Sequence, residues 1–129
     1  MFHIGWSLDG LGELSREQGD FRTAQERFEE SLAIFRQIGN KIGICSGLER
    51  LAVVAVAHGQ SRRAACLFAT VKRLRETMGL PAEGAEHDRS IAAVRTLLGE
   101  EAFAAAWAQG RATPLNEAIE YALDESEDP

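Results

Sequence analysis

The sequence has no long apolar run and few cysteines. Its apolar runs, such as LAVVAVA from Leu51 to Ala57, are far shorter than the roughly 20 residues that span a bilayer, so we expect no membrane segment. The N-terminal MFHIGWSLDG lacks the basic and apolar blocks of a signal peptide. Cys45 and Cys66 lie in apolar helical stretches and not at metal-ligand spacing, which predicts two reduced, buried thiols in a cytoplasmic protein. A disulfide between neighbouring helices is the alternative.

Basic residues are outnumbered. Lysine and arginine total 14 against 20 aspartate and glutamate residues, the formal net charge is -6 at pH 7, and the chain ends in DESEDP. Because nucleic-acid binding draws its affinity from clustered lysine and arginine, we expect no direct nucleic-acid binding. The acidic tail, residues 125–129, is expected to be solvated.

Signatures of catalysis and cofactor binding are also missing. His3, His58 and His87 occur without a His-x-x-x-His motif or a cysteine at matching spacing, and the chain has no glycine-rich phosphate loop. Adjacent carboxylates such as Glu29 and Glu30 are expected on a helix surface, away from any convergent pocket. The sequence therefore predicts no enzyme, no cofactor and no metal site.

What the sequence does contain is a repeat with a period of 40 residues. Its 129 residues, 45% of them hydrophobic, fit one domain over residues 1–129. A shift of 40 aligns the first two copies in these pairs: Leu8 with Leu48, Leu11 with Leu51, Gly12 with Ala52, Gly19 with Gly59, Ala24 with Ala64, and Phe28 with Phe68. A weaker third copy keeps the same register through Ile91, Gly99 and Ala104.

Each copy is predicted to be two helices joined at the repeated glycine. In the first copy Gly19 supplies a left-handed helix end and Asp20 caps the next helix. Small residues at Gly12 and Ala24, and at their equivalents, allow neighbouring helices to approach closely. Two apolar stripes mark the helices of the first copy, one at Leu8, Leu11 and Leu14 and one at Phe21, Ala24, Phe28, Leu32 and Phe35.

These residues resemble a known repeat. The pattern Leu-x-x-Leu-Gly, Gly-Asp-Phe and Ala-x-x-x-Phe, from Leu8 to Phe28, resembles the tetratricopeptide repeat, although Leu8 stands at the usual tryptophan, Ser15 at the usual aromatic, and the period is 40 where about 34 is usual. The resemblance implies an all-α solenoid of about three helical hairpins in a right-handed superhelix. Repeat 1 would span about 2–39, repeat 2 about 40–79, and a degenerate repeat 3 with a capping helix about 82–124.

The end of the third copy predicts the capping helix. Thr113 and Pro114 are typical of a helix start, and the helix that follows carries Leu115, Ala118, Ile119, Ala122 and Leu123 on one face. We expect this helix to cover the last apolar surface of the solenoid. The alternative is that it lies in the groove of the superhelix, where a partner displaces it.

Nearly the whole chain is also similar to the C-terminal helical-repeat region of large bacterial ATP-dependent regulators of the LuxR type, most distinctively from Leu98 to Ala118. The resemblance implies a non-enzymatic sensor or partner-binding arm of a larger regulator. The alternatives are a module for homo-oligomerisation, through an apolar edge around Phe2, Ile4 and Trp6, and a small-ligand sensor.

The resemblance to tetratricopeptide repeats also implies where a protein or peptide would bind, because the first helix of each pair lines the concave face. The candidate partner-binding residues are Trp6, Asp9, Glu13, Arg16, Glu49, Arg50, Val53, Val56, Arg89, Ala93 and Thr96. This apolar floor with mixed-charge walls suits an extended peptide or an amphipathic helix, with Arg50 and Arg89 holding a carboxylate. The alternative is that Val53 and Val56 are core residues and the charges are solvated.

Overall fold

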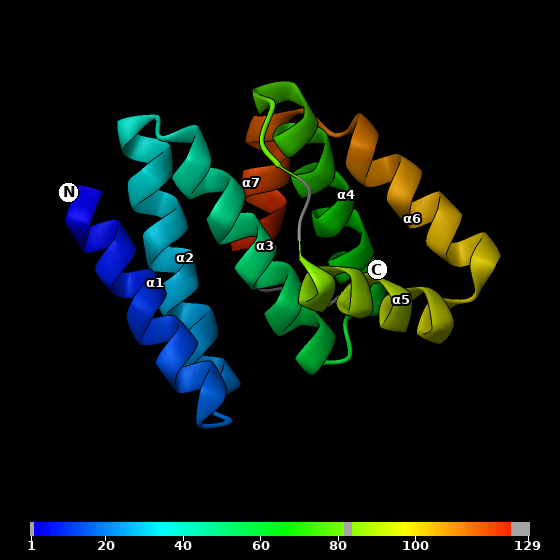
Figure 1. The fold of residues 1–129 in the computed structure, drawn as a ribbon, viewed down its shortest axis with the longest axis horizontal. Coiled ribbons are helices and arrows are strands. Elements are labelled where there is room, and N and C mark those ends of the chain that lie inside the picture. The colour runs from blue at the N-terminus through cyan, green and yellow to red at the C-terminus, as the bar shows by residue number, and fades with distance from the viewer. Residues whose placement is uncertain (1, 82–83, 125–129) are drawn as a thin grey trace.

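The computed structural model describes residues 2–81 and 84–124, and within them the chain is all helix and turn (Figure 1). No helix in these two ranges is long and apolar enough to cross a membrane. The helices are α1 Phe2–Glu17, α2 Phe21–Ile38, α3 Lys41–Ala57, α4 Ser61–Met78, α5 Ala85–Leu98, α6 Glu100–Ala112 and α7 Leu115–Leu123. The predicted all-α helical solenoid is confirmed. The predicted acidic tail, residues 125–129, lies outside the described residues.

Five glycines divide the chain into units of 20 residues. Gly19, Gly39, Gly59, Gly79 and Gly99 all have positive φ angles, from 68° to 86°. Glycine adopts this left-handed conformation without the steric cost that a Cβ atom brings, so each one ends a helix and turns the chain back. The predicted turns at Gly19, Gly59 and Gly99 are therefore present, and two more lie between them.

Side chains cap the helices that follow the first two of these turns. Asp20 accepts a hydrogen bond from the backbone N–H of Thr23 at 3.1 Å, and Asn40 accepts one from Gly43 at 2.9 Å. Hydrogen bonding from the Thr23 side chain, and then from its backbone N–H, holds the pKa of Asp20 below its ordinary value. Each cap satisfies a backbone donor that the first turn of a helix leaves without an acceptor.

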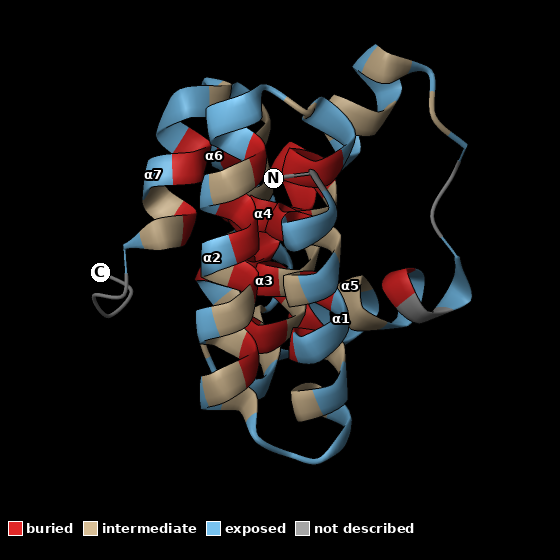
Figure 2. Ribbon diagram, turned by 90° about the vertical axis from the view of Figure 1, so that its left-hand side faces the viewer, coloured by how far each residue is buried: buried red, intermediate tan, exposed pale blue. Residues whose placement is uncertain are grey.

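The first two hairpins pack as adjoining layers, α1 on α2, α2 on α3, and α3 on α4. Phe28, Leu32 and Phe35 of α2 are fully buried at the centre of this stack. Close packing depends on glycine: a Cβ on Gly12 would lie 2.4 Å from the ring of Phe28, and one on Gly43 would lie 2.3 Å from the ring of Phe35. Figure 2 shows the buried positions gathered where α2, α3, α4 and α6 face one another.

The leucines of α1 share one face, as their spacing predicts, but that face lies away from α2. Leu11 and Leu14 are each 52% exposed, whereas Leu48 and Leu51, the equivalents of Leu8 and Leu11 in α3, are buried. Glycines let α1 approach α2 on its other side, so the leucines are not needed for that contact. The equivalent faces of α1 and α3 therefore have different surroundings.

The third repeat is built differently from the first two. Helix α6 packs mainly on α4 and only lightly on α5, its own hairpin partner. Gly110 makes this possible, because a Cβ there would lie 2.1 Å from the carbonyl oxygen of Cys66. The hydroxyl of Thr70 donates to the Gly110 carbonyl oxygen at 2.8 Å. Ala104, predicted to be a small contact residue like Ala64, is instead exposed, because the contact runs through the face that carries Gly110.

Helix α7 folds back against α2, α3 and α4, on the side of the second helices of the hairpins (Figures 1 and 2). Its predicted apolar face is buried at Ala118, Ile119 and Ala122. Arg63 donates to the carbonyl oxygens of Tyr121 at 2.8 Å and Asp124 at 2.5 Å, at the C-terminal end of α7. The last helix thus covers the outer side of the stack, and none of its residues lines the groove described next.

Candidate functional site

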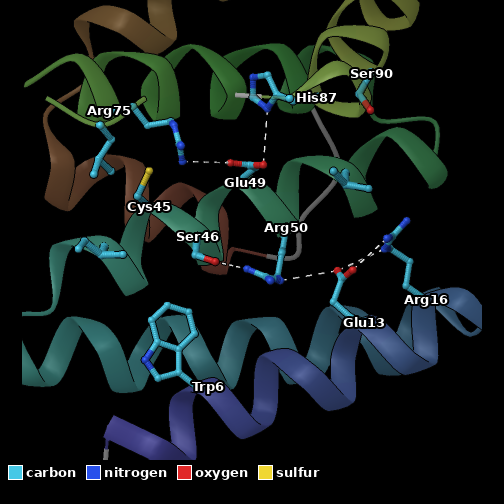
Figure 3. Close-up of a pocket in the computed structure, with 14 residues that line it drawn as sticks. Trp6, Glu13, Arg16, Cys45, Ser46, Glu49, Arg50, Arg75, His87 and Ser90 are labelled. Atoms are coloured by element: carbon cyan, nitrogen blue, oxygen red, sulfur yellow. Dashed lines mark hydrogen bonds and ion pairs between the residues drawn. The ribbon is translucent and has the colours of Figure 1, made fainter. Parts of the chain in front are cut away.

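A groove of about 510 Å³ runs between α1, α3 and α5, the first helices of the three hairpins (Figure 3). Helices α1 and α3 supply most of its wall, and α5 closes it together with Leu80 and Gly84. Its lining residues are Trp6, Glu13, Arg16, Ile42, Cys45, Ser46, Glu49, Arg50, Val53, Arg75, Leu80, Gly84, His87 and Ser90.

The structure places the predicted site residues in three different settings. Six of them line the groove: Trp6, Glu13, Arg16, Glu49, Arg50 and Val53. Asp9 is buried beside it at 2% exposure, and Val56 is half-buried outside the lining. The three predicted residues of α5, Arg89, Ala93 and Thr96, are exposed and outside the lining. Helix α5 presents His87 and Ser90 to the groove in their place.

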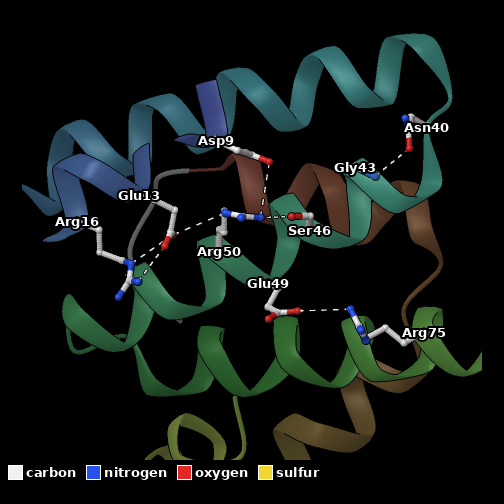
Figure 4. A network of polar contacts seen from close by, with 9 residues as sticks. All are labelled: Asp9, Glu13, Arg16, Asn40, Gly43, Ser46, Glu49, Arg50 and Arg75. Atoms are coloured by element: carbon white, nitrogen blue, oxygen red, sulfur yellow. Dashed lines mark hydrogen bonds and ion pairs between the residues drawn. The ribbon is translucent and has the colours of Figure 1, made fainter. Parts of the chain in front are cut away.

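Arg50 links α1 to α3 at the polar end of the groove (Figure 4). Its guanidinium lies 3.7 Å from the carboxylate of Asp9 and 3.6 Å from that of Glu13, and it donates a hydrogen bond to the hydroxyl of Ser46. Arg16 completes the chain of charges with a 2.9 Å contact to Glu13. The chain's own carboxylates therefore surround Arg50, and Arg89 is not beside it. That Arg50 and Arg89 hold a carboxylate of a partner stays a prediction, and of the two only Arg50 lines the groove.

Asp9 has an unusual environment for a carboxylate. Burial raises its pKa above the ordinary value, although the Ser31 hydroxyl and the charge of Arg50 act in the opposite direction. The nearby charge of Glu13 raises it further. A buried carboxylate stays ionised only when an opposite charge compensates it. Arg50 supplies that charge for Asp9, and the Asp9 carboxylate in turn helps to hold the Arg50 guanidinium in place.

A second polar cluster joins α3 to α5. Glu49 lies 3.6 Å from Nδ1 of His87 and 3.9 Å from the guanidinium of Arg75. His87 is 7% exposed and meets the ring of Phe68 edge-on, with ring centroids 5.1 Å apart. Burial raises the pKa of Glu49, but the contact with His87 and the charges of Arg75 and Arg50 outweigh it, so this pKa lies below its ordinary value.

The other end of the groove is apolar. Trp6 packs on Phe35 with ring centroids 4.8 Å apart, and Ile42 is 55% exposed at the start of α3. Figure 3 shows Trp6 at the end opposite to Glu13 and Arg16. The groove thus combines an aromatic and aliphatic anchor site with walls whose charges are already paired.

Several lining residues were missed by the sequence interpretation. Arg75 comes from α4, and Leu80 and Gly84 from the connection to α5, so a rule that counts only first helices does not reach them. Ser46 stands one period after Trp6 and Ser90 one period after Arg50, so extending the register to these neighbours would have found both. His87 stands where the preceding repeat has Gly47, and this replacement of a small residue by a histidine could have marked His87 as a candidate groove residue.

The arrangement is suited to holding a polypeptide. Within residues 2–81 and 84–124, no group of three His, Cys, Asp or Glu side chains is placed to hold a metal ion. Cys45 and Cys66 are buried free thiols. An exposed apolar anchor flanked by fixed polar groups is the usual design of a surface that binds peptide segments.

The family model for the tetratricopeptide repeat matches residues 3–77. Comparisons with curated proteins and with solved structures gave no match. The matched range takes in the first two hairpins, α1 to α4, which are also the regular part of the structure. With more than half of its 129 residues inside this match, and with repeated helical hairpins stacked around a groove, the chain belongs to the tetratricopeptide repeat family.

Proposed function

We propose that this chain is a non-enzymatic interaction module that holds a peptide segment of a partner protein in the groove between α1, α3 and α5. Tetratricopeptide repeats generally mediate protein–protein interaction. One observation supports the groove as the binding site: it has a volume of about 510 Å³, and all three first helices contribute residues to its lining. An extended segment or one amphipathic helix is the kind of ligand that such a surface accepts.

The chemistry of the groove restricts the partner. Arg16, Arg50 and Arg75 each lie within 4 Å of a carboxylate of the chain itself, so they offer little uncompensated positive charge. Trp6 and Ile42 offer an apolar surface at the other end. The fitting segment therefore carries a large apolar anchor residue for the Trp6 end and neutral or mixed-charge residues along the rest.

We also propose a wider role, based on the sequence pattern from Leu98 to Ala118, which resembles LuxR-type bacterial regulators. In this proposal the chain is the sensor or partner-binding arm of such a regulator in the cytoplasm. The two buried free thiols suit a reducing compartment. The partner segment would then report a signal to the rest of the regulator.

Peptide selection tests the groove directly. A random 12-residue display library is selected against the full chain, and the enriched peptides are synthesised with a fluorescent label for anisotropy titration. Ser90→Trp fills the groove from α5 and should weaken binding at least about tenfold by steric exclusion. Thr96→Trp, on the exposed side of the same helix, is the matched control and should leave binding within about twofold.

Two outcomes would refute the proposed site. Either the two tryptophan variants weaken the peptides equally, or the enriched peptides carry no large apolar residue. A circular dichroism melt of each variant checks that the fold is kept.

A further inference from the structure

The outward face of α1 is an exposed apolar stripe. Ile4, Leu11 and Leu14 are each 52% exposed, and Leu8 is half-buried between them. The four lie at i, i+4, i+7 and i+10, which places them along one side of the helix. Among the described residues, three of the six large apolar side chains that are exposed belong to this stripe.

The repeat shows that this stripe is a packing face. Its equivalents one period later, on α3, are Ile44, Leu48, Leu51 and Val54, and these are between 0% and 5% exposed. Helix α3 lies between α2 and α4, so both of its sides are covered. In the described part of the chain no helix covers the equivalent side of α1, although its residues are as apolar as those of α3.

We propose that α1 of a second copy of this chain covers the stripe, with the two helices antiparallel in a symmetric dimer. In the register where facing residue numbers sum to 18, Ile4 faces Leu14 of the second copy and Leu11 faces Ser7. At the centre of the pair a large residue meets a small one, since Leu8 likewise faces Gly10, and this lets the helices interdigitate, while Ile4 and Leu14 form an apolar contact at each end. Near the twofold axis Gly10 leaves further room, since a Cβ there would meet nothing within 4 Å.

Charge also favours the antiparallel arrangement. The positions beside the stripe, Ser7, Ser15 and Gln18, are uncharged, so pairing buries no like charges. His3 at the start of α1 and Glu17 at its end are both exposed, and antiparallel pairing sets His3 of one copy close to Glu17 of the other. The opposed helix dipoles add to this preference, whereas a parallel pair would place like ends together.

The dimer would leave the groove free, because Trp6, Glu13 and Arg16 lie on a different face of α1 from the stripe. Two open grooves in one particle make a bivalent receptor, in which binding of the second segment of a divalent partner becomes intramolecular. Self-association therefore adds to peptide binding and does not compete with it.

The expected dimer is reversible. Helix α1 has 16 residues and is about 24 Å long, and one pair of such helices buries less than the roughly 1,200 Å² of a standard stable interface. The molecular mass of the full chain in solution should therefore rise with concentration, which sedimentation equilibrium or light scattering measures from about 5 to about 500 µM.

The decisive variant is Leu11→Asp. The wild-type mass should rise from 14.1 kDa towards twice that value, while Leu11→Asp stays at the monomer mass throughout. Leu97→Asp is the matched control, because Leu97 is a leucine that is 67% exposed on α5, and it should dimerise like the wild type. A wild-type chain that stays at monomer mass overturns the proposal, and so does a dimer that Leu11→Asp preserves or that Leu97→Asp equally abolishes.

Cross-linking tests the orientation. Ile4→Cys and Leu14→Cys chains, mixed under mild oxidation, should form a mixed disulfide dimer, while each variant alone should cross-link far less. The native Cys45 and Cys66 are buried and stay out of this reaction. Efficient cross-linking of Ile4→Cys with itself would instead indicate a parallel pair and overturn the antiparallel model. Ser90→Trp should dimerise normally, which separates this proposal from the one for the groove.

Discussion

The junction between the first two hairpins and the junction between the second and third use different helices, although the repeat register is the same. At the first junction α3 packs on α2. At the second, α6 makes the main contact with α4, and α5 packs more lightly. The regular junction lies inside the range that matches the tetratricopeptide repeat model, residues 3–77, and the altered one lies beyond it.

Glycine placement explains the difference. On α3, a Cβ at Gly43 would lie 2.3 Å from the ring of Phe35 and one at Gly47 would lie 3.3 Å from Leu32, so the absence of side chains lets α3 approach α2. One period later the sequence has Glu83 and His87 at these positions. In the third copy the glycine at a close helix contact is Gly110, on α6, and that helix makes the close approach. Small residues, more than repeat register, decide which helix docks on the preceding hairpin.

Gly110→Ala should break the second junction and cause the largest loss of stability. Its methyl group would lie 2.1 Å from the carbonyl oxygen of Cys66, a backbone atom that cannot move independently of α4. We expect the free energy of unfolding, measured in urea, to fall by about 3 kcal/mol, because overpacking at a backbone contact forces whole helices apart. Hydrogen exchange in α6 should accelerate more than in α2.

Gly10→Ala is the control for this change, measured in dilute solution. A Cβ at Gly10 meets nothing within 4 Å, so the variant should gain up to about 1 kcal/mol from the better helix propensity of alanine. Equal effects of the two alanine variants would contradict the account based on glycine placement.

Gly43→Ala should strain the first junction by a smaller amount. The methyl group would lie 2.3 Å from the buried ring of Phe35, a side chain and not a backbone atom, so we expect a loss of about 2 kcal/mol. Trp6 packs on the same ring, and its fluorescence should therefore change when Phe35 moves. Trp107→Phe leaves Trp6 as the sole tryptophan for this measurement. Unchanged stability with unchanged Trp6 emission would mean that α3 does not need the glycine.

The sequence predicted those parts of the structure that depend on local chemistry. Positive φ at Gly19 and Gly59 requires glycine, and the stripe around Phe28 has the period of a helix, so the turns and hairpins follow from the pattern. The pattern treats every copy as equivalent, and this assumption does not hold for the third copy. It placed Ala104 at a helix contact, but Ala104 is exposed, and Arg89 lies outside the groove lining. The orientation of α5 and α6 depends on tertiary distances at Gly110, which no spacing rule contains.

The smallest of the three effects concerns how α5 is held. Helix α3 docks on α2 through apolar contacts at glycines, whereas the contact of α5 with α3 includes Glu49 and His87, 3.6 Å apart, so the attachment of α5 should depend on pH and that of α3 to α2 should not. The pKa of Glu49 is lower in the folded chain than its ordinary value of about 4.3, so its ionisation contributes stability that is present above that value and lost as the pH falls through the folded pKa. Glu49→Gln should therefore lower the free energy of unfolding by up to about 1 kcal/mol at pH 6, as expected for one partly exposed charge contact.

This difference between Glu49→Gln and wild type should shrink as the pH falls through the folded-state pKa of Glu49, because the wild-type carboxylate then becomes protonated as well. Asp9→Asn is the contrasting control. Burial raises the pKa of Asp9 in the folded chain, so ionisation of Asp9 opposes folding, and its asparagine variant should be at least as stable as wild type at pH 6, with an advantage that fades on acidification. Urea unfolding of wild type, Glu49→Gln and Asp9→Asn at several pH values measures both stability differences and shows whether they have opposite signs. A loss in Glu49→Gln that stays constant as the pH falls would show that Glu49 acts through packing and not through its charge, and α5 would then be held in the same way as α3.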